Sequence, residues 1–142
     1  MQRSFKFHSS HWLTLIISLG HAAVAGALVM IPMQKFALIL LFVVLIWSVT
    51  YYLLRDALLA LPGSWVGLRL EDEQLTLFNR RGDAMIGRLL KSSVVMPNLV
   101  ILNIAITNHR WTQNVILMPD SMDEESFRQL RVALKWGVVL TA

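Results

Sequence analysis

The sequence predicts an α+β membrane protein, in which a helical hairpin of two transmembrane helices carries a small antiparallel β-sheet or barrel domain with a C-terminal helix. Two long apolar runs within the first 55 residues predict the hairpin. Short apolar stretches separated by polar turns predict the strands. A final segment with apolar residues at helical spacing predicts the helix. We expect these two parts to account for the 142 residues.

The two apolar runs are long enough to cross a bilayer. Residues 12–31 and 36–54 would extend roughly 30 Å as helices, which matches a hydrocarbon core about 30 Å thick. The second run holds 13 Leu, Ile, Phe and Val residues and gains roughly −4 to −8 kcal/mol on insertion, whereas the first holds nine and gains roughly −3 to −5 kcal/mol. Only Pro32 to Lys35 separate the runs, so we expect a tight hairpin whose first span depends on the second.

The first run contains an ionisable residue, His21, near its middle. A titratable side chain at this depth is a candidate for an intramembrane function. The alternative is a structural hydrogen bond to Ser48, to Thr50 or to a backbone carbonyl. Neither run contains Asp or Glu, which argues against a proton pathway.

Small residues also recur every four positions in the first run, at Ser18, Ala22 and Gly26. This spacing places them in one stripe along a helix, where small side chains let helices approach closely in lipid. We expect the stripe to pack within the hairpin, and homodimerisation through the same stripe is the alternative.

Basic residues indicate which side of the membrane the termini occupy. The first 11 residues contain two basic residues, Arg55 follows the second run, and the connecting loop contains only Lys35. By the positive-inside rule, this predicts a multi-pass membrane protein with both termini in the cytoplasm. A cleaved signal peptide is the alternative, but apolar sequence continues to Ile31 and a second span follows.

These patterns divide the chain into four segments. We predict a cytoplasmic N-terminal tail (1–11), a transmembrane hairpin (12–54), a juxtamembrane linker (55–61) and a cytoplasmic β-rich domain (62–142). Within the domain, residues 98–106 are the most apolar and are rich in β-branched residues. This run is too short for a third span, so we predict a buried central strand, with a re-entrant or interfacial segment as the alternative.

The C-terminal helix is predicted over residues 121–136. Ser121 and Glu124 have the spacing of a capping box. Apolar residues follow at helical spacing, namely Phe127, Leu130 and Leu134. The neighbouring face carries Arg128, Arg131 and Lys135, which form either a solvated face or a contact surface for a partner or for lipid headgroups.

Composition and motifs argue against several functional classes. The chain has no cysteine, and His8 and His11 lack nearby carboxylates that would complete a metal site. The sequence contains no Walker loop, no G-x-S-x-G elbow and no H-E-x-x-H motif. Of the net charge of +4, only +1 lies in residues 62–142, which is too little for a typical nucleic-acid binder. We therefore expect a non-enzymatic protein without metal or cofactor.

The residues at the start of the predicted C-terminal helix point to a particular family. The segment from Asp120 to Glu125, which leads into Phe127–Arg131, resembles the C-terminal signature of the YgfX/CptA family of bacterial inner-membrane proteins. The plan of the chain is also similar, with Trp12 opening a first span, a loop broken by Pro32, a second span and a small β-rich domain.

The resemblance implies the toxin component of a toxin–antitoxin pair. The implied partner is a small cytoplasmic antitoxin of the SdhE/CptB type, which also serves as a succinate-dehydrogenase flavinylation factor. The implied targets are the cytoskeletal proteins FtsZ and MreB, and hence cell division and cell shape. The resemblance supplies no catalytic residues.

We therefore predict an interaction protein anchored in the membrane. Candidate partner contacts are the basic residues Arg80, Arg81, Arg128, Arg131 and Lys135. The alternative is a membrane-anchored pleckstrin-homology-like module for lipid sensing or scaffolding, in which Arg80 and Arg81 face lipid headgroups.

Overall fold

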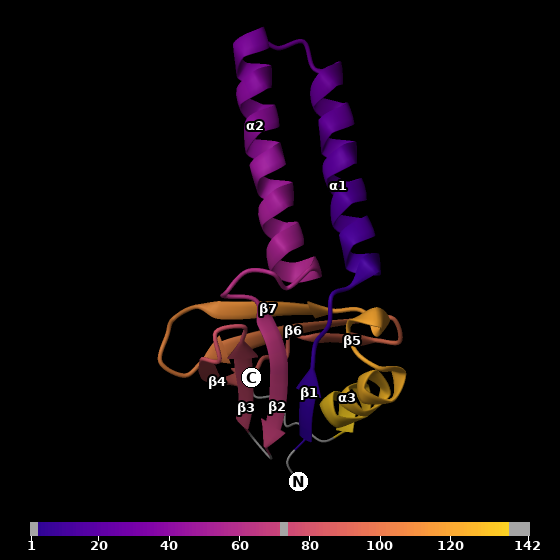
Figure 1. The fold of residues 1–142 in the computed structure, drawn as a ribbon, viewed down its shortest axis with the longest axis vertical. Helices are drawn as coiled ribbons and strands as arrows, with labels where there is room; N and C mark the ends of the chain where they lie inside the picture. Colours follow the sequence, from indigo (N-terminus) through magenta and orange to yellow (C-terminus); the bar gives the residue numbers. More distant parts are fainter. Residues whose placement is uncertain (1–2, 72–73, 137–142) are drawn as a thin grey trace.

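The computed structural model describes residues 3–71 and 74–136, and it confirms the predicted α+β fold class. A hairpin of two long helices stands on a curved β-domain that a third helix closes (Figure 1). The hairpin consists of α1 (His11–Met30) and α2 (Lys35–Tyr52), and a π-helical turn, η1 (Leu53–Ala57), continues α2 into the domain.

Both helices of the hairpin are long and apolar enough to cross a membrane. Within the protein, only 6% of the apolar window of α1 and 0% of that of α2 are buried, so their side chains face outward on nearly all sides. Exposing this much apolar surface to water would be strongly unfavourable, at about 25 cal/mol for each Å². The hairpin therefore requires an apolar environment around it.

The two helices of the hairpin face each other through a different stripe from the one predicted. The half-buried positions of α1 are Thr14, Ile17, His21, Ala25 and Leu28. Ser18, Ala22 and Gly26 are exposed, and a Cβ added at Gly26 would meet nothing within 4 Å. The hairpin thus does not use the small-residue stripe for its own packing, because its helices meet through the half-buried row of α1 side chains instead.

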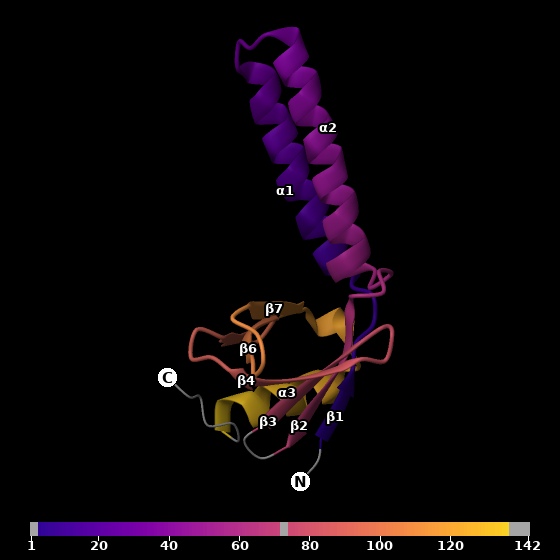
Figure 2. The same ribbon diagram turned by 90° about the vertical axis from the view of Figure 1, so that its left-hand side faces the viewer.

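In the described part of the chain, the domain contains one antiparallel sheet of seven strands. The order of its strands is β1-β2-β3-β4-β6-β5, and β7 pairs with the other side of β6. The strands are β1 (Arg3–Lys6), β2 (Trp65–Glu71), β3 (Gln74–Asn79), β4 (Ala84–Leu89), β5 (Val94–Met96), β6 (Leu99–Ile106) and β7 (Thr112–Leu117). The sheet curls so that β7 lies nearest the hairpin, and helix α3 (Glu124–Trp136) lies farther from it (Figures 1 and 2).

The segment before the hairpin corrects the predicted division of the chain. Residues 1–11 were expected to be a tail, but Arg3–Lys6 form strand β1, which pairs with β2 so that Phe5 faces Leu68. Phe5 is 4% exposed and belongs to the core of the domain. The hairpin is therefore inserted between the first two strands of one sheet, and the β-domain does not begin at residue 62.

The core lies between the curved sheet and α3. In β6 every second residue is buried, and Val100, Leu102 and Ile104 are 0% exposed, as a central strand requires. This confirms the predicted strand and excludes a re-entrant segment. Gly87 allows β4 to approach β6, because a Cβ there would lie 2.5 Å from a methyl carbon of Ile104.

Helix α3 covers the core with the predicted apolar stripe, Phe127, Leu130 and Leu134, all of which are buried. Its predicted start is wrong, because Asp123 is the N-cap. The Asp123 carboxylate accepts a hydrogen bond from the backbone N–H of Ser126 at 2.9 Å. Ser121 instead belongs to a preceding 3₁₀ turn, η2 (Pro119–Ser121), where its hydroxyl accepts a hydrogen bond from the N–H of Met118 at 2.9 Å.

Candidate functional site

Asp120 lies at the centre of a hydrogen-bond network that joins the β-domain to the first turn of α1. The hydroxyl of Ser10 donates to Asp120 Oδ1 at 2.6 Å. The backbone N–H groups of His11 and Trp12 donate to Oδ2 at 2.8 and 3.1 Å. Ser10 itself caps α1, because its Oγ accepts from the N–H of Leu13 at 3.0 Å. Side chains about 110 residues apart thus share the capping of one helix.

The electrostatics of this network favour the ionised carboxylate. The N-terminus of a helix carries partial positive charge, and three donors converge on the two oxygens of Asp120. Partial burial alone would raise the pKa of Asp120, but the hydrogen bonds from Ser10, Trp12 and His11 outweigh it, so the pKa lies below its ordinary value.

Further contacts reinforce the same junction. The N–H of Ser10 donates to the carbonyl oxygen of Ala57 at 2.9 Å, which ties the start of α1 to the end of η1. Leu13, Ala57 and Met118 form a small buried cluster that is separate from the main core. We call this region, comprising residues 8–13, 53–57 and 118–121, the hairpin junction.

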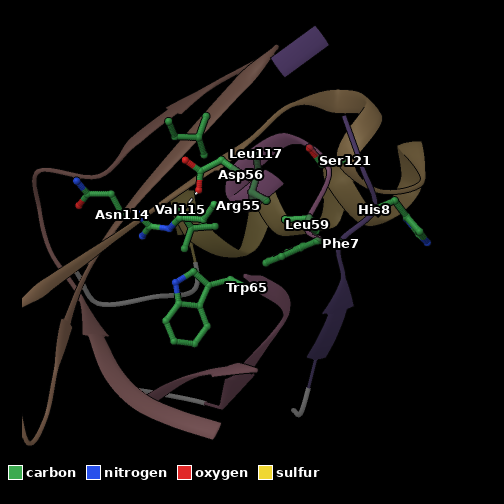
Figure 3. Close-up of a pocket in the computed structure, with 11 residues that line it drawn as sticks. Phe7, His8, Arg55, Asp56, Leu59, Trp65, Asn114, Val115, Leu117 and Ser121 are labelled. Atoms are coloured by element: carbon green, nitrogen blue, oxygen red, sulfur yellow. Dashed lines mark ion pairs between the residues drawn. The ribbon is translucent and has the colours of Figure 1, made fainter. Parts of the chain in front are cut away.

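The foot of the hairpin also carries an ion pair, shown in Figure 3. Arg55 Nε lies 3.6 Å from Asp56 Oδ1, and both side chains are about 30% exposed. They line a small cavity together with Trp65 of β2 and Asn114 of β7. The two charges neutralise each other, and both residues belong to η1 at the foot of the hairpin.

The predicted contact residue Arg80 has a structural role at the same end of the domain. Its Nη1 donates to the carbonyl oxygen of Leu59 at 2.8 Å, and its backbone N–H donates to that of Ser64 at 3.0 Å. Leu59 has a positive φ of 51°, which a non-glycine residue adopts at a cost of about 1 kcal/mol or more. Arg80 thus holds the loop between η1 and β2, and the neighbouring Arg81 is exposed.

The other predicted basic residues lie on α3. Arg128 and Lys135 are exposed, and Arg131 is half buried with its guanidinium 5.9 Å from the ring centre of Phe127. Arg128 pairs with Glu125, whose carboxylate it contacts at 2.7 Å. This pairing, together with a hydrogen bond from Gln129, lowers the pKa of Glu125 to about 2.

The five predicted basic residues therefore do not form one surface. Strand β3 runs toward the hairpin, so Arg80 and Arg81 in the β3–β4 turn lie near the hairpin foot, whereas α3 lies farther away (Figure 1). The structure adds two apolar residues to the α3 group, because Val132 is 46% and Trp136 is 79% exposed.

His21 has the structural hydrogen bonds that the sequence suggested. One ring nitrogen, Nδ1, lies 2.8 Å from the carbonyl oxygen of Ile17, and the other, Nε2, lies 3.2 Å from Ser48 Oγ. The imidazole therefore bridges α1 and α2. The small residues Ser18, Ala22 and Gly26 lie on the outer surface of α1 and take no part in this contact.

Sequence reasoning missed the role of Asp120. A signal for half of the network was available, because Ser10 lies two residues before the apolar run that begins at Trp12, where an N-cap is expected. The other half was hidden, because a lone Asp in a turn does not reveal which distant helix it caps.

Comparison with known proteins places the chain in a family. A family model, Cpta_toxin, described as the membrane-bound toxin component of a toxin–antitoxin system, matches residues 1–138. No curated protein and no solved structure matches the chain. The matched residues include both helices of the hairpin, all seven strands and α3. The chain therefore belongs to the Cpta_toxin family of membrane-bound toxin components of toxin–antitoxin systems.

Proposed function

We propose that the outer face of α3 is the surface on which the cognate antitoxin docks. One observation carries this proposal: Val132 and Trp136 are exposed on a helix whose opposite side is buried in the core. Arg128, Val132 and Trp136 follow one another at intervals of four residues, so they lie along one side of the helix. We call this side, together with Arg131 and Lys135, the α3 face.

The chemistry of the α3 face fits a small acidic cytoplasmic protein. Trp and Arg are the residue types that most often dominate the energy of an interface. The Lys135 ammonium lies 5.6 Å from the ring centre of Trp136, so charge and apolar surface are adjacent. An acidic partner with an apolar spot would satisfy both features, and the antitoxin implied by the family resemblance is the proposed occupant.

The proposed topology places this face in the cytoplasm of a bacterium, with the hairpin crossing the inner membrane. Strand β1 precedes the hairpin and strand β2 follows it, yet they pair in one sheet. That pairing supports a hairpin that crosses the membrane twice and returns to its starting side. The basic residues flanking the spans support the cytoplasmic side, by the positive-inside rule.

We further propose that toxicity is non-enzymatic and acts on the cytoskeletal proteins FtsZ and MreB. In the described residues, Asp120, Asp123 and Asn79 serve as structural hydrogen-bond partners, which is consistent with a binding role for the domain. The lipid-sensing or scaffold module remains the alternative prediction.

The proposed docking surface is tested by two tryptophan variants. Trp136→Ala removes the exposed ring of the α3 face, and Trp111→Ala removes a ring of 76% exposure from the β6–β7 turn as a matched control. We expect Trp136→Ala to weaken binding of the antitoxin, measured by co-purification from membranes, by about thirtyfold or more, because tryptophans that dominate an interface contribute about 2 kcal/mol or more. Trp111→Ala should leave it unchanged.

A matched pair of charge variants separates contact from folding. Lys135→Glu reverses a charge on the α3 face, and Lys91→Glu reverses an exposed charge after β4. Loss of the antitoxin with Lys135→Glu alone supports the proposal. Equal retention by Trp136→Ala, Lys135→Glu and their controls would show that the antitoxin docks elsewhere. Parallel capture of FtsZ and MreB tests the proposed targets.

A further inference from the structure

An apolar groove runs along the outer side of α2, toward the foot of the hairpin. Its volume is about 440 Å³. It is lined by Val43, Ile46, Trp47, Tyr51 and Leu54 of α2, and by Leu61 from the loop that follows η1. The N–H of Leu61 lies 3.4 Å from the carbonyl oxygen of Leu54, so this loop folds back against the helix.

The lining of this groove suits an apolar occupant. Thr50 also lines it, but its hydroxyl donates to the carbonyl oxygen of Ile46 at 2.8 Å and is thereby satisfied within the helix. Trp47 is 78% exposed, so one wall of the groove is open to the surroundings of the hairpin. In a membrane, those surroundings are lipid acyl chains.

The length of the groove matches one leaflet of a bilayer. From Val43 to Leu54 the helix rises roughly 16 Å, which is about half of a hydrocarbon core 30 Å thick. A single acyl chain can therefore lie along the groove from the hairpin foot to the middle of the bilayer.

Arginine side chains belong to the segments at the foot of the groove, where the charge of Arg55 is paired with that of Asp56. The guanidinium of Arg55 lies 5.9 Å from the ring centre of Tyr51, which lines the groove. The loop that supplies Leu61 is held at both ends by Arg80, through Leu59 and Ser64. The exposed Arg81 follows directly in the same turn. Arginine is well suited to phosphate because its guanidinium donates several hydrogen bonds in one plane.

We propose that this groove binds one anionic phospholipid from the leaflet next to the β-domain. Its acyl chain lies along α2, and its phosphate lies near Arg55 and Arg81. The lipid thus contacts both the hairpin and the loop that Arg80 holds to the domain. This site is separate from the α3 face, so a negative result for the lipid site would not affect the proposed antitoxin surface, and the reverse also holds.

Native mass spectrometry of the full-length protein in detergent tests this proposal. The protein is titrated with phosphatidylglycerol, which is anionic, and with phosphatidylcholine of the same acyl chains, which has no net charge. We expect one tightly retained phosphatidylglycerol and a preference of about fivefold or more over phosphatidylcholine, since each basic group near a membrane surface contributes roughly that factor.

Groove-filling variants test the position of the lipid. Val43→Trp fills the end of the groove within the membrane, and Leu61→Trp fills its foot, so either should remove the retained lipid. Ile39→Trp is the control, because Ile39 is 63% exposed on α2 and does not line the groove. Val43 is 58% exposed, so its replacement should not disturb the fold even if Leu61→Trp does.

Charge variants test the headgroup contact. Arg81→Gln should lower the preference for phosphatidylglycerol about fivefold and leave phosphatidylcholine binding unchanged, whereas Arg88→Gln on β4 should change neither. Retention of the lipid by Val43→Trp, or equal binding of the two lipids to the wild type, would overturn the proposal. So would a dimer that Val43→Trp dissociates, because the groove would then be occupied by a second copy of the chain.

Discussion

Helix α1 is held in two different ways along its length. At its first turn, in the hairpin junction, the carboxylate of Asp120 and the hydroxyl of Ser10 bind its free backbone N–H groups. Farther along α1, away from the β-domain, apolar side chains pack against α2, and His21 makes a polar contact to Ser48. Directional, charged contacts thus lie at the end of α1 next to the β-domain, where its free N–H groups need a cap, and mostly nonpolar packing holds the helix farther from the domain.

The largest effect is expected from removing the charged cap. Asp120→Ala deletes the acceptor of three hydrogen bonds, so we expect the free energy of unfolding to fall by about 2–3 kcal/mol. Asp123→Ala is the matched control, because it removes the cap of α3 and should cost about 1 kcal/mol. Thermal unfolding of both variants in detergent measures the difference. If Asp120→Ala lowers the free energy of unfolding no more than Asp123→Ala does, the stabilising role assigned to the hairpin junction is wrong.

A smaller effect follows from pH. The pKa of Asp120 is lowered in the folded protein, so the carboxylate stabilises the fold fully above its unfolded pKa, which is about 3.9. This stabilisation is lost as pH falls through the lower folded pKa. We expect the wild type to lose stability below about pH 4 more steeply than Asp120→Asn does. A stability difference between the two proteins that stays constant from neutral pH to about pH 3 would contradict this assignment.

The smallest effect is expected within the hairpin. Hydrogen bonds between membrane helices contribute about 0.6 kcal/mol on average, so His21→Leu and Ser48→Ala should show a coupling of about that size in a double-mutant cycle. Thr50→Ala is the control partner, because the Thr50 hydroxyl bonds within its own helix and should show no coupling to His21. A coupling as large as the Asp120 effect would reverse the contrast between the two regions of α1.

The parts of the fold that local sequence determines were predictable. Length and apolar content identified the hairpin, the short apolar run rich in β-branched residues identified β6, and the stripe of α3 followed from periodicity. Strand β1 was not recognised, because a run of four residues with one buried side chain becomes a strand only through its pairing with β2. The start of α3 was predicted at the wrong residue, because Ser121 and Asp123 are both suitable caps. In the structure Asp123 caps the helix, and the Ser121 hydroxyl binds the N–H of Met118 instead.

The candidate site was also predictable only in part, because it depends on tertiary contacts. The sequence shows which residues are basic but not which of them already have partners. Arg80 is engaged by Leu59, and Arg128 by Glu125, whereas Trp136 and Val132 are exposed although they are apolar. Tertiary contacts decide which of these side chains remain available to a partner.

The central claim is that the hairpin is an insertion between the first two strands of one β-domain. The chain has no cysteine, so a pair of introduced cysteines reports on this directly. Ser4 and Arg69 face each other across β1 and β2, where paired Cα atoms lie about 4.5–5.5 Å apart, within the range of a disulfide. Ser4 and Thr76 are the control, because Thr76 lies one strand further, on β3. In oxidised native membranes, Ser4→Cys with Arg69→Cys should form an intramolecular disulfide, and Ser4→Cys with Thr76→Cys should not. Failure of the first pair to form the disulfide, or equal yields from both pairs, would contradict the claim.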